Sequence, residues 1–209
     1  MKLSTKKIYL IRHGQTDYNK RGIVQGSGVD TSLNEYGREQ ARAFFEKYKG
    51  IPFDRIYTSA LKRSQESVRM FIETGIPLEV HSGLNEINWG NKEGQPITPE
   101  EDEYYHYILD QWKEGNIELQ IQGGESPVDV TNRLIPVVDK IKSRESENTI
   151  LICMHGRAMR ILLCYLLDYP LTRMDNFEHT NLGLYIVNYT NGGFAVELAN
   201  DTSHLEFLS

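Results

Sequence analysis

An arginine and a histidine stand side by side at the end of a short apolar run near the amino terminus. Ile8-Tyr9-Leu10-Ile11 is too short for a helix and has the residue types of a buried strand, and Arg12-His13-Gly14 follows it directly. Gly14 leaves the backbone free to turn sharply where the strand ends. A cation beside an imidazole nucleophile at a strand end suits covalent chemistry on a phosphate group.

Further polar groups follow the strands predicted at 54–57, 77–80 and 149–153. In chain order they are Arg63, Glu86 and His155. Ligands of parallel α/β sheets bind outside the carboxyl ends of the strands, so we expect these side chains to meet Arg12 and His13 at one edge of the sheet.

The pattern of predicted elements indicates the fold class. Strands alternate with helical stripes, which predicts an α/β protein with a mainly parallel central sheet and helices on both faces, a three-layer arrangement. Asn191-Gly192 between two apolar runs predicts a C-terminal antiparallel hairpin. We expect a single domain over residues 1–209. Residues 91–124, acidic and rich in aromatic side chains, are predicted to form a small cap insertion with a helix that opens at Thr98-Pro99.

These residue types can carry out phosphoryl transfer without a metal or another cofactor. An unprotonated His13 is a competent nucleophile, and nearby Arg12 and Arg63 should lower its pKa. The forked donors of the two arginines match the oxygens of a transferring phosphoryl group, and His155 would add a contact. Glu86 is the candidate proton donor to the leaving oxygen, after which water would release the phosphate from His13.

The composition excludes several other classes. The formal charge of −6 disfavours a nucleic-acid-binding protein, whose footprint is a basic face. We find neither the apolar stretch of a signal peptide nor a run of membrane-spanning length, and Cys153 and Cys164 show no metal-type or redox-type spacing. We therefore expect a cytoplasmic, reduced protein without membrane or nucleic-acid partners, and we leave a homodimer open.

At this point the chain resembles the histidine phosphatase superfamily, also called phosphoglycerate-mutase-like. The family signature corresponds to Leu10-Ile11-Arg12-His13-Gly14-Gln15-Thr16, with Asn19 following. The other family blocks stand in order at Gln25-Gly26, 33–41, 59–63, 84–90, 123–126 and His155-Gly156. The resemblance covers essentially the whole chain, and the ordered set of blocks is much more specific than the triplet alone.

The resemblance implies a role for each matching position. His13 would be the phosphorylated residue, and the phosphate pocket would consist of Arg12, Arg63 and His155. Glu86 would be the proton donor. Further contacts are expected from Asn19, Gln25, Gly26, Trp89, Gly156 and Arg157. The chain departs from the family pattern at Lys92, where many members have an aromatic residue, and at Arg157, where a small residue is common.

Cys153 and the remaining histidines each allow another interpretation. Cys153 suggests a cysteine phosphatase, but that chemistry needs five residues between the cysteine and an arginine, and here Met159 stands at the arginine position. The remaining histidines show no ligand spacing, so surface or packing roles are predicted for His81, His106, His179 and His204.

Within the family the alternatives are a phosphatase and a phosphoglycerate mutase, and outside enzymes a non-catalytic module that binds a phosphorylated ligand. A mutase needs a second anion clamp over the pocket, and residues 91–124 hold eight acidic residues against two lysines. That acidity should repel a second anion, and Gln25 resembles the phosphatase branch. We therefore predict hydrolysis of a small phosphomonoester. Short members of similar layout include alpha-ribazole phosphatase, which gives one candidate substrate beside sugar phosphates.

Overall fold

The computed structural model describes residues 5–95 and 99–208. Its centre is a six-stranded sheet in the order β3-β2-β4-β1-β5-β6. The strands are β1 (Thr5–Arg12), β2 (Arg55–Thr58), β3 (Leu78–Val80), β4 (Thr149–Met154), β5 (Leu184–Thr190) and β6 (Gly193–Asp201). The pairs from β3 through β1 are parallel, and β5 joins β1 and β6 antiparallel. The predicted α/β class and C-terminal hairpin are confirmed.

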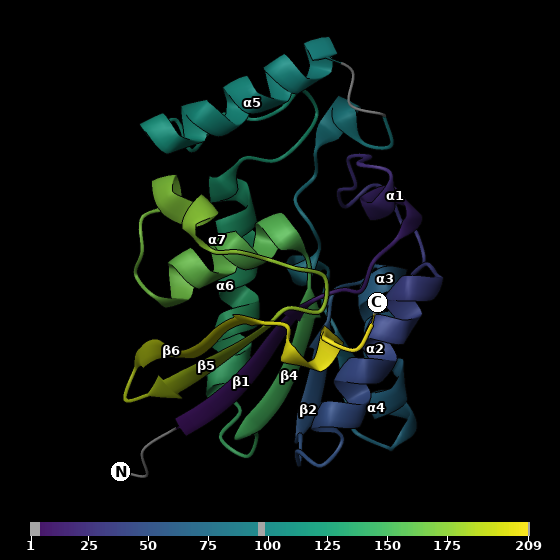
Figure 1. The fold of residues 1–209 in the computed structure, drawn as a ribbon. Helices are drawn as coiled ribbons and strands as arrows, with labels where there is room; N and C mark the ends of the chain where they lie inside the picture. The colour runs from purple at the N-terminus through teal and green to yellow at the C-terminus, as the bar shows by residue number, and fades with distance from the viewer. Residues whose placement is uncertain (1–4, 96–98, 209) are drawn as a thin grey trace.

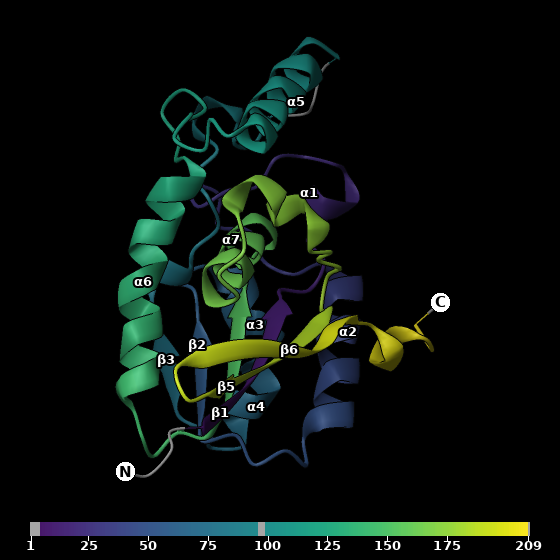
Figure 2. The ribbon, with the colours of Figure 1, turned by 90° about the vertical axis from the view of Figure 1, so that its left-hand side faces the viewer.

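Helices cover both faces of this sheet (Figures 1 and 2). They are α1 (Asp17–Lys20), α2 (Glu35–Tyr48), α3 (Lys62–Ser67), α4 (Arg69–Glu73), α5 (Pro99–Glu114), α6 (Pro127–Ser143) and α7 (Gly156–Leu166). Short 3₁₀ turns are η1 (Ser82–Leu84), η2 (Gly90–Lys92), η3 (Leu171–Asn176) and η4 (Ser203–Leu205). Figure 2 shows α6 on one side of the sheet and α2 on the other, with α5 set across the end above them.

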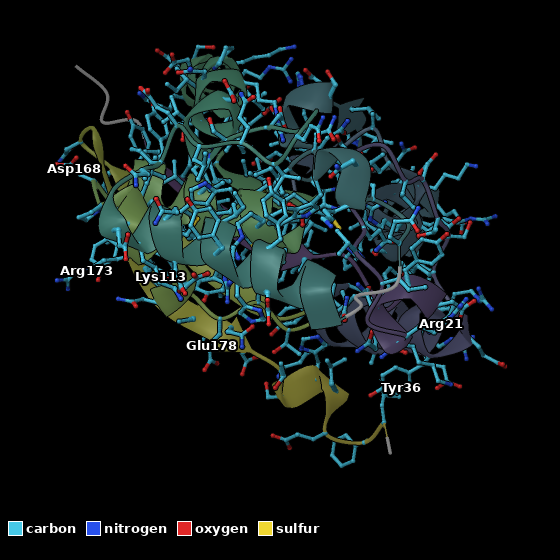
Figure 3. All side chains as sticks on the ribbon, turned by 90° about the horizontal axis from the view of Figure 1, so that it is seen from above. Arg21, Tyr36, Lys113, Asp168, Arg173 and Glu178 are labelled. Carbon is cyan, nitrogen blue, oxygen red and sulfur yellow. The ribbon has the colours of Figure 1, made fainter. Side chains whose placement is uncertain are left out.

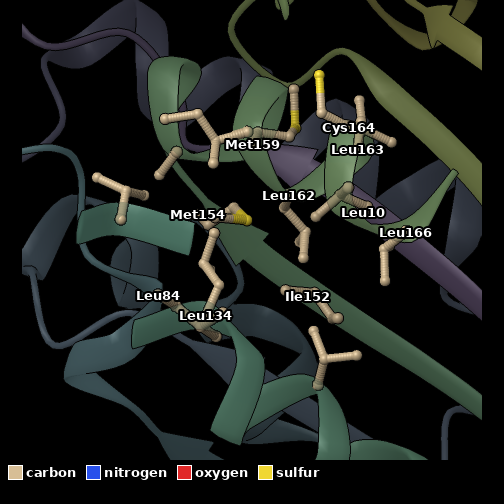
Figure 4. Packing of buried hydrophobic residues seen from close by; sticks show 14 of the residues in the cluster. Leu10, Leu84, Leu134, Ile152, Met154, Met159, Leu162, Leu163, Cys164 and Leu166 are labelled. Carbon is tan, nitrogen blue, oxygen red and sulfur yellow. The ribbon is translucent and has the colours of Figure 1, made fainter. Parts of the chain in front are cut away.

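The apolar strands divide their side chains between two cores because successive residues point to opposite faces. Ile8 and Leu10 of β1 join the cluster formed with α6 and α7. Tyr9 and Ile11 join the cluster under α2 and α4. Figure 4 shows the first of these cores, where Leu134 packs near Met154. Two-sided burial explains why these strands read as continuous apolar runs.

Local sequence explains the hairpin and the start of α2. Asn191 and Gly192 have φ of 56° and 88°, the left-handed conformations that a tight two-residue hairpin turn requires. Asn34 caps α2, because its side chain accepts a hydrogen bond from the N–H of Gly37.

Three predicted boundaries were wrong. The glycine and polar residues of 17–32 predict a loop, but this segment begins with α1, because Thr16 and Asn19 form a capping box that starts a helical turn. Thr58-Ser59 predict a helix cap, but the helix begins at Lys62 and is interrupted between α3 and α4. The apolar run from Met159 predicts a helix that starts there, but α7 begins earlier, at Gly156.

The segment 91–124 carries α5 across the end of the molecule toward which the parallel strands run (Figures 1 and 3). Trp112 is buried and its indole N–H donates to the carbonyl oxygen of Leu119 (2.8 Å), which fixes the returning chain. The expected helix cap at Thr98 lies outside the described residues, and Pro99 is the first helical residue.

Candidate active site

The ends of β1 and β4 bring two histidines together. The N–H of His13 donates to the carbonyl oxygen of Met154 (3.0 Å), so the chain beyond β1 stays paired with β4 where both strands end. The rings of His13 and His155 lie with their centroids 5.1 Å apart, and both side chains are buried. The predicted convergence of Arg12, His13 and His155 at one sheet edge is therefore present.

The hydrogen bond of His13 defines which ring nitrogen is available. Nδ1 lies 2.7 Å from the carbonyl oxygen of Gly14, an acceptor, so the geometry assigns the proton to Nδ1 and leaves a lone pair on Nε2. Burial holds the pKa of His13 well below its ordinary value, and the charges of Arg63 and Arg12 lower it further. The predicted direction is confirmed, although burial has a larger effect than the arginines.

Gly14 is required by a close approach of two backbones. A Cβ at this position would lie 2.7 Å from the carbonyl oxygen of Gly37. The N–H of Gly14 donates to Ser67 Oγ (2.9 Å), which ties the turn after β1 to α3. The turn that carries His13 is thus held from two sides.

Arg63, in the first turn of α3, is fully buried and bonded to neutral groups. Its guanidinium donates to the carbonyl oxygens of Val29 (2.5 Å) and Gly26 (3.0 Å) and, through Nε, to His155 Nδ1 (3.3 Å). Burial lowers its pKa to about 10. His155 Nε2 in turn lies 2.7 Å from Ser59 Oγ. Because Nδ1 accepts from Arg63, the geometry assigns the His155 proton to Nε2.

His155 is a neutral ring in this arrangement. Burial, followed by the charges of Arg63 and neighbouring groups, holds its pKa well below the ordinary value. It therefore contributes a hydrogen-bonding ring to the site and not a second positive charge.

Arg12 has a partner that the sequence did not indicate. Its Nη1 donates to the carbonyl oxygen of His179 (2.8 Å) and lies 3.0 Å from His179 Nδ1. Its buried Nε has no hydrogen-bond partner among the described residues. Both partners of Arg12 are neutral, so its charge, like that of Arg63, is held beside dipoles without a directly bonded carboxylate. Two such cations favour the binding of an anion.

Glu86 sits at the amino-terminal end of α7. Its Oε1 accepts from the backbone N–H groups of Ile87 and Ala158 (both 2.9 Å), and Oε2 accepts from that of Arg157 (3.1 Å). Side-chain capping by the N-cap residue of α7 is absent, and Glu86 supplies acceptors to the first turn instead. A carboxyl group from the segment after η1 is thereby fixed beside the strand ends.

A cavity of about 210 Å³ is lined in part by Arg12 and Glu86. Its lining contains Arg12, Asn19, Gly22, Ile23, Val24, Gln25, Glu86, Trp89, Tyr105, Gly156, Arg157 and His179. Of the predicted contact residues, Gly26 alone lies outside this lining; its carbonyl oxygen binds Arg63 instead. His13, Arg63 and His155 are buried and lie outside the lining as well.

Sequence reasoning missed two lining side chains, His179 and Tyr105, and the lining segment 22–24. His179 was assigned to the surface or to packing because no ligand spacing surrounds it. It precedes Asn181, whose side-chain N–H donates to the carbonyl oxygen of His13 (2.9 Å). His179 belongs to a polar segment directly before β5, and β5 is the neighbour of β1 in the sheet. This position in the sequence is the signal that could have indicated a role for His179.

Arg157 is held at the cavity wall by opposite charge and aromatic rings. Its Nη1 donates to Asp175 Oδ1 (2.6 Å), and its guanidinium carbon lies 5.9 Å and 5.6 Å from the ring centroids of Trp89 and Trp112. The side chain thus connects α7 with η3 and with α5. Lys92, the other departure from the family pattern, lies over the ring of Tyr104 and is not part of the lining.

Four acidic side chains of the segment 91–124 face solvent. The acidic side chains of Glu103, Asp110, Glu114 and Glu118 are exposed and do not line the cavity. Among the described residues of 91–124, Tyr105 is the one that does. The net charge of the segment therefore does not describe the charge at the cavity, where the cations of Arg12 and Arg157 are present. The exposure of these four side chains weakens the electrostatic argument against a second anion.

Three other features bear on alternative functions. Within residues 5–95 and 99–208, no group of three or more His, Cys, Asp or Glu side chains is placed to hold a metal ion. None of the helices in the described chain has the length and apolarity needed to cross a membrane. Cys153 is buried outside the cavity lining, and burial raises the pKa of its thiol.

Comparison with known proteins agrees with this site. The family model described as histidine phosphatase superfamily (branch 1) matches residues 8–202, and the chain belongs to this family. A Schizosaccharomyces pombe protein named probable phosphatase C1687.21 is 28% identical over 214 residues, covering 96% of this chain and 95% of that protein. A Yersinia pestis protein named probable phosphoglycerate mutase GpmB is 28% identical with the same coverage.

Solved structures share the fold over nearly the whole chain. Bacillus stearothermophilus YhfR is 29% identical with a TM-score of 0.84, covering 96% of this chain and 100% of that one. Mycobacterial glucosyl-3-phosphoglycerate phosphatase Rv2419c is 26% identical with a TM-score of 0.81, covering 95% and 100%. A putative alpha-ribazole-5'-P phosphatase of Escherichia coli has a TM-score of 0.82, covering 94% of this chain and 96% of that one. At 22% sequence identity, this similarity shows only a shared fold.

Proposed function

We propose that this protein hydrolyses a small phosphomonoester through a phosphohistidine at His13, without a metal ion. The observation that carries the proposal is the hydrogen bond of His13: Nδ1 lies 2.7 Å from the carbonyl oxygen of Gly14, which leaves the lone pair on Nε2. Arg12 and Arg63 lie nearby, and their bonded partners are neutral. A neutral nucleophile next to unneutralised cations is suited to an anionic electrophile.

In the proposed reaction Nε2 of His13 forms a bond to phosphorus while the bond from phosphorus to the leaving oxygen breaks. The carboxyl group of Glu86, in its protonated form, gives its proton to that oxygen. Water then attacks phosphorus, the Glu86 carboxylate takes a proton from this water, and the nitrogen–phosphorus bond breaks. Inorganic phosphate leaves, and both side chains return to their starting state. Arg12 and Arg63 stabilise the charge on the phosphoryl oxygens in both steps.

The cavity and the relatives support a small substrate. A volume of about 210 Å³ lies below the range of roughly 300–1,000 Å³ that is typical of sites for drug-sized ligands. Relatives named as phosphatases support hydrolysis. The aromatic wall of Trp89 and Tyr105, together with Arg157, would contact the leaving group.

The test is turnover of p-nitrophenyl phosphate in the presence of EDTA. We expect the wild-type protein to release p-nitrophenol and His13→Ala to be inactive, because the nucleophile is lost. His106→Ala, on the exposed face of α5, is a control that should retain activity. An active His13→Ala protein, or failure to trap an acid-labile phosphoryl group on His13, would contradict the mechanism.

Phosphoglycerate mutase activity is the second candidate. It is favoured by the GpmB relative and by Arg157, which puts a second guanidinium at the cavity wall while the acidic side chains of α5 described above face solvent. The measurement is interconversion of phosphoglycerates with added bisphosphate. Isomerisation faster than hydrolysis would assign the protein to the mutases.

A further inference from the structure

The guanidinium of Arg12 is held from one side. Nη1 is engaged twice by His179, through its ring Nδ1 and its carbonyl oxygen, at 3.0 Å and 2.8 Å. Nε is buried, and for neither Nε nor Nη2 does the described chain provide a hydrogen-bond partner. These two nitrogens form the edge of the guanidinium that binds two oxygens of a phosphate in parallel.

We propose that His179 is a positioning residue of the phosphate site, which holds Nη1 of Arg12 so that the Nε–Nη2 edge stays available for the phosphoryl oxygens. The inference rests on the proposed function, because it gives Arg12 its phosphate-binding role. His179 itself lines the same cavity as Arg12.

The ring of His179 must be neutral to do this. Arg12 is a donor at every working pH, so Nδ1 of His179 is the acceptor and Nε2 carries the proton. Charged groups from two packed elements act on the ring: Arg12 at the end of β1, and Arg157 and Arg160 on α7. Burial and these cations lower the pKa of His179 to about 3. The acceptor is therefore preserved throughout the neutral range.

The His179 ring also packs closely against the first residue of α7. A Cβ on Gly156 would lie 3.2 Å from both Nδ1 and Cε1 of His179, tighter than ordinary van der Waals contact. Glycine at this position lets the imidazole pack directly on the helix backbone. The ring therefore has little room to rotate away from Arg12.

The experiment compares His179→Asn with His179→Leu. The Asn Oδ1 stands at the same number of bonds from the backbone as Nδ1 and can accept from Arg12, whereas Leu has a similar shape and no acceptor. We measure kcat/KM for p-nitrophenyl phosphate and the affinity for orthovanadate, a phosphate analogue. We expect His179→Leu to lose about 10²-fold in kcat/KM, the order of loss caused by a misplaced catalytic group, and His179→Asn to stay within about 5-fold of wild type.

A double-mutant comparison with Arg12 distinguishes a positioning role of His179 from a general effect on the structure. In an Arg12→Met background the guanidinium is absent, so His179→Leu should change kcat/KM by less than about 2-fold. Equal losses in the two backgrounds, or equal losses for the Asn and Leu variants, would overturn the proposal. If His179→Leu does not fold, His179→Gln replaces it, because its acceptor stands one bond too far. A wild-type protein without orthovanadate binding or phosphatase activity would instead overturn the proposed function.

Discussion

At the scale of single residues, the chemistry of the site depends on which histidine ring nitrogens already have a hydrogen-bond partner within the protein. His13 uses Nδ1 to bind the carbonyl oxygen of Gly14, and His155 uses both ring nitrogens, for Arg63 and Ser59. Of these two adjacent histidines, His13 therefore keeps a nitrogen for chemistry. The burial that lowers its pKa also keeps that nitrogen unprotonated at neutral pH.

The role of Glu86 as proton donor can be tested with substrates whose leaving groups differ in their need for a proton. Glu86→Gln removes the transferable proton, and we expect kcat/KM for an alkyl phosphate to fall by about 10²- to 10⁴-fold, the usual contribution of a general acid. The loss for p-nitrophenyl phosphate should be much smaller, because p-nitrophenolate leaves without being protonated. Steady-state kinetics with both substrates provide the measurement. Equal losses on the two substrates would remove Glu86 from the role of proton donor.

At the scale of elements, α6 positions the segment that carries Glu86. Arg133 donates to the carbonyl oxygens of Gly83 (2.8 Å), Asn85 (2.9 Å) and Glu86 (3.0 Å). The same guanidinium binds Glu125 through Nε and Nη2. This carboxylate comes just before the cap of α6 and also accepts from the N–H of Asn88 (2.9 Å). The segment from η1 to Trp89 is thus shaped by a helix on which no reacting group lies.

Arg133→Met should therefore impair catalysis from a distance. With three carbonyl oxygens released, Glu86 shifts, and we expect kcat for an alkyl phosphate to fall about 10²-fold, with a smaller loss for p-nitrophenyl phosphate. Steady-state kinetics and thermal unfolding are measured together. Arg144→Met is the matched control, since Arg144 pairs with Glu79 (2.6 Å) and Glu147 (3.2 Å) at the other end of the sheet. It should lower stability and leave kcat unchanged; a similar kcat loss in both variants would contradict the positioning role.

At the scale of the whole molecule, four histidines link stability to pH. Burial holds the pKa of His13 and His155 well below 6.5, and lowers those of His179 and His204 to about 3 and about 4. Below pH 6.5 the unfolded chain binds protons at these positions and the native state does not. The free energy of unfolding must therefore fall as the pH drops, by up to about 1.4 kcal/mol per pH unit for each histidine.

His204 allows this effect to be measured away from the cavity. Its ring is buried edge-on against Phe44 and Tyr48, so His204→Phe keeps the aromatic packing and removes one titrating group. We expect the decrease in unfolding free energy between pH 7 and pH 5 to be smaller in this variant by about 1–2 kcal/mol. Urea unfolding at the two pH values is the measurement. An unchanged pH dependence would show that His204 takes up its proton in the native state.

The amino-acid sequence alone predicted where the strands end and which polar residues follow them. Short apolar runs followed by Arg12-His13, Glu86 and His155 predicted the strand ends, since two-sided burial demands continuous apolar residues and the polar groups mark where the sheet stops. The turn at Asn191-Gly192 was also predicted correctly, because its conformation depends on the residues themselves. These are local properties.

Tertiary structure alone decided the partners of those groups. His179 lies 167 positions from Arg12 in the chain, and no spacing rule connects them until β5 pairs with β1. The net charge of 91–124 predicted repulsion of anions, yet the acidic side chains of α5 described above face solvent while Arg157 faces the cavity. A sequence specifies which charges exist, but the direction in which each side chain points depends on packing between distant elements. The tautomer of His13, the neutrality of His155 and the charge at the cavity follow from that packing.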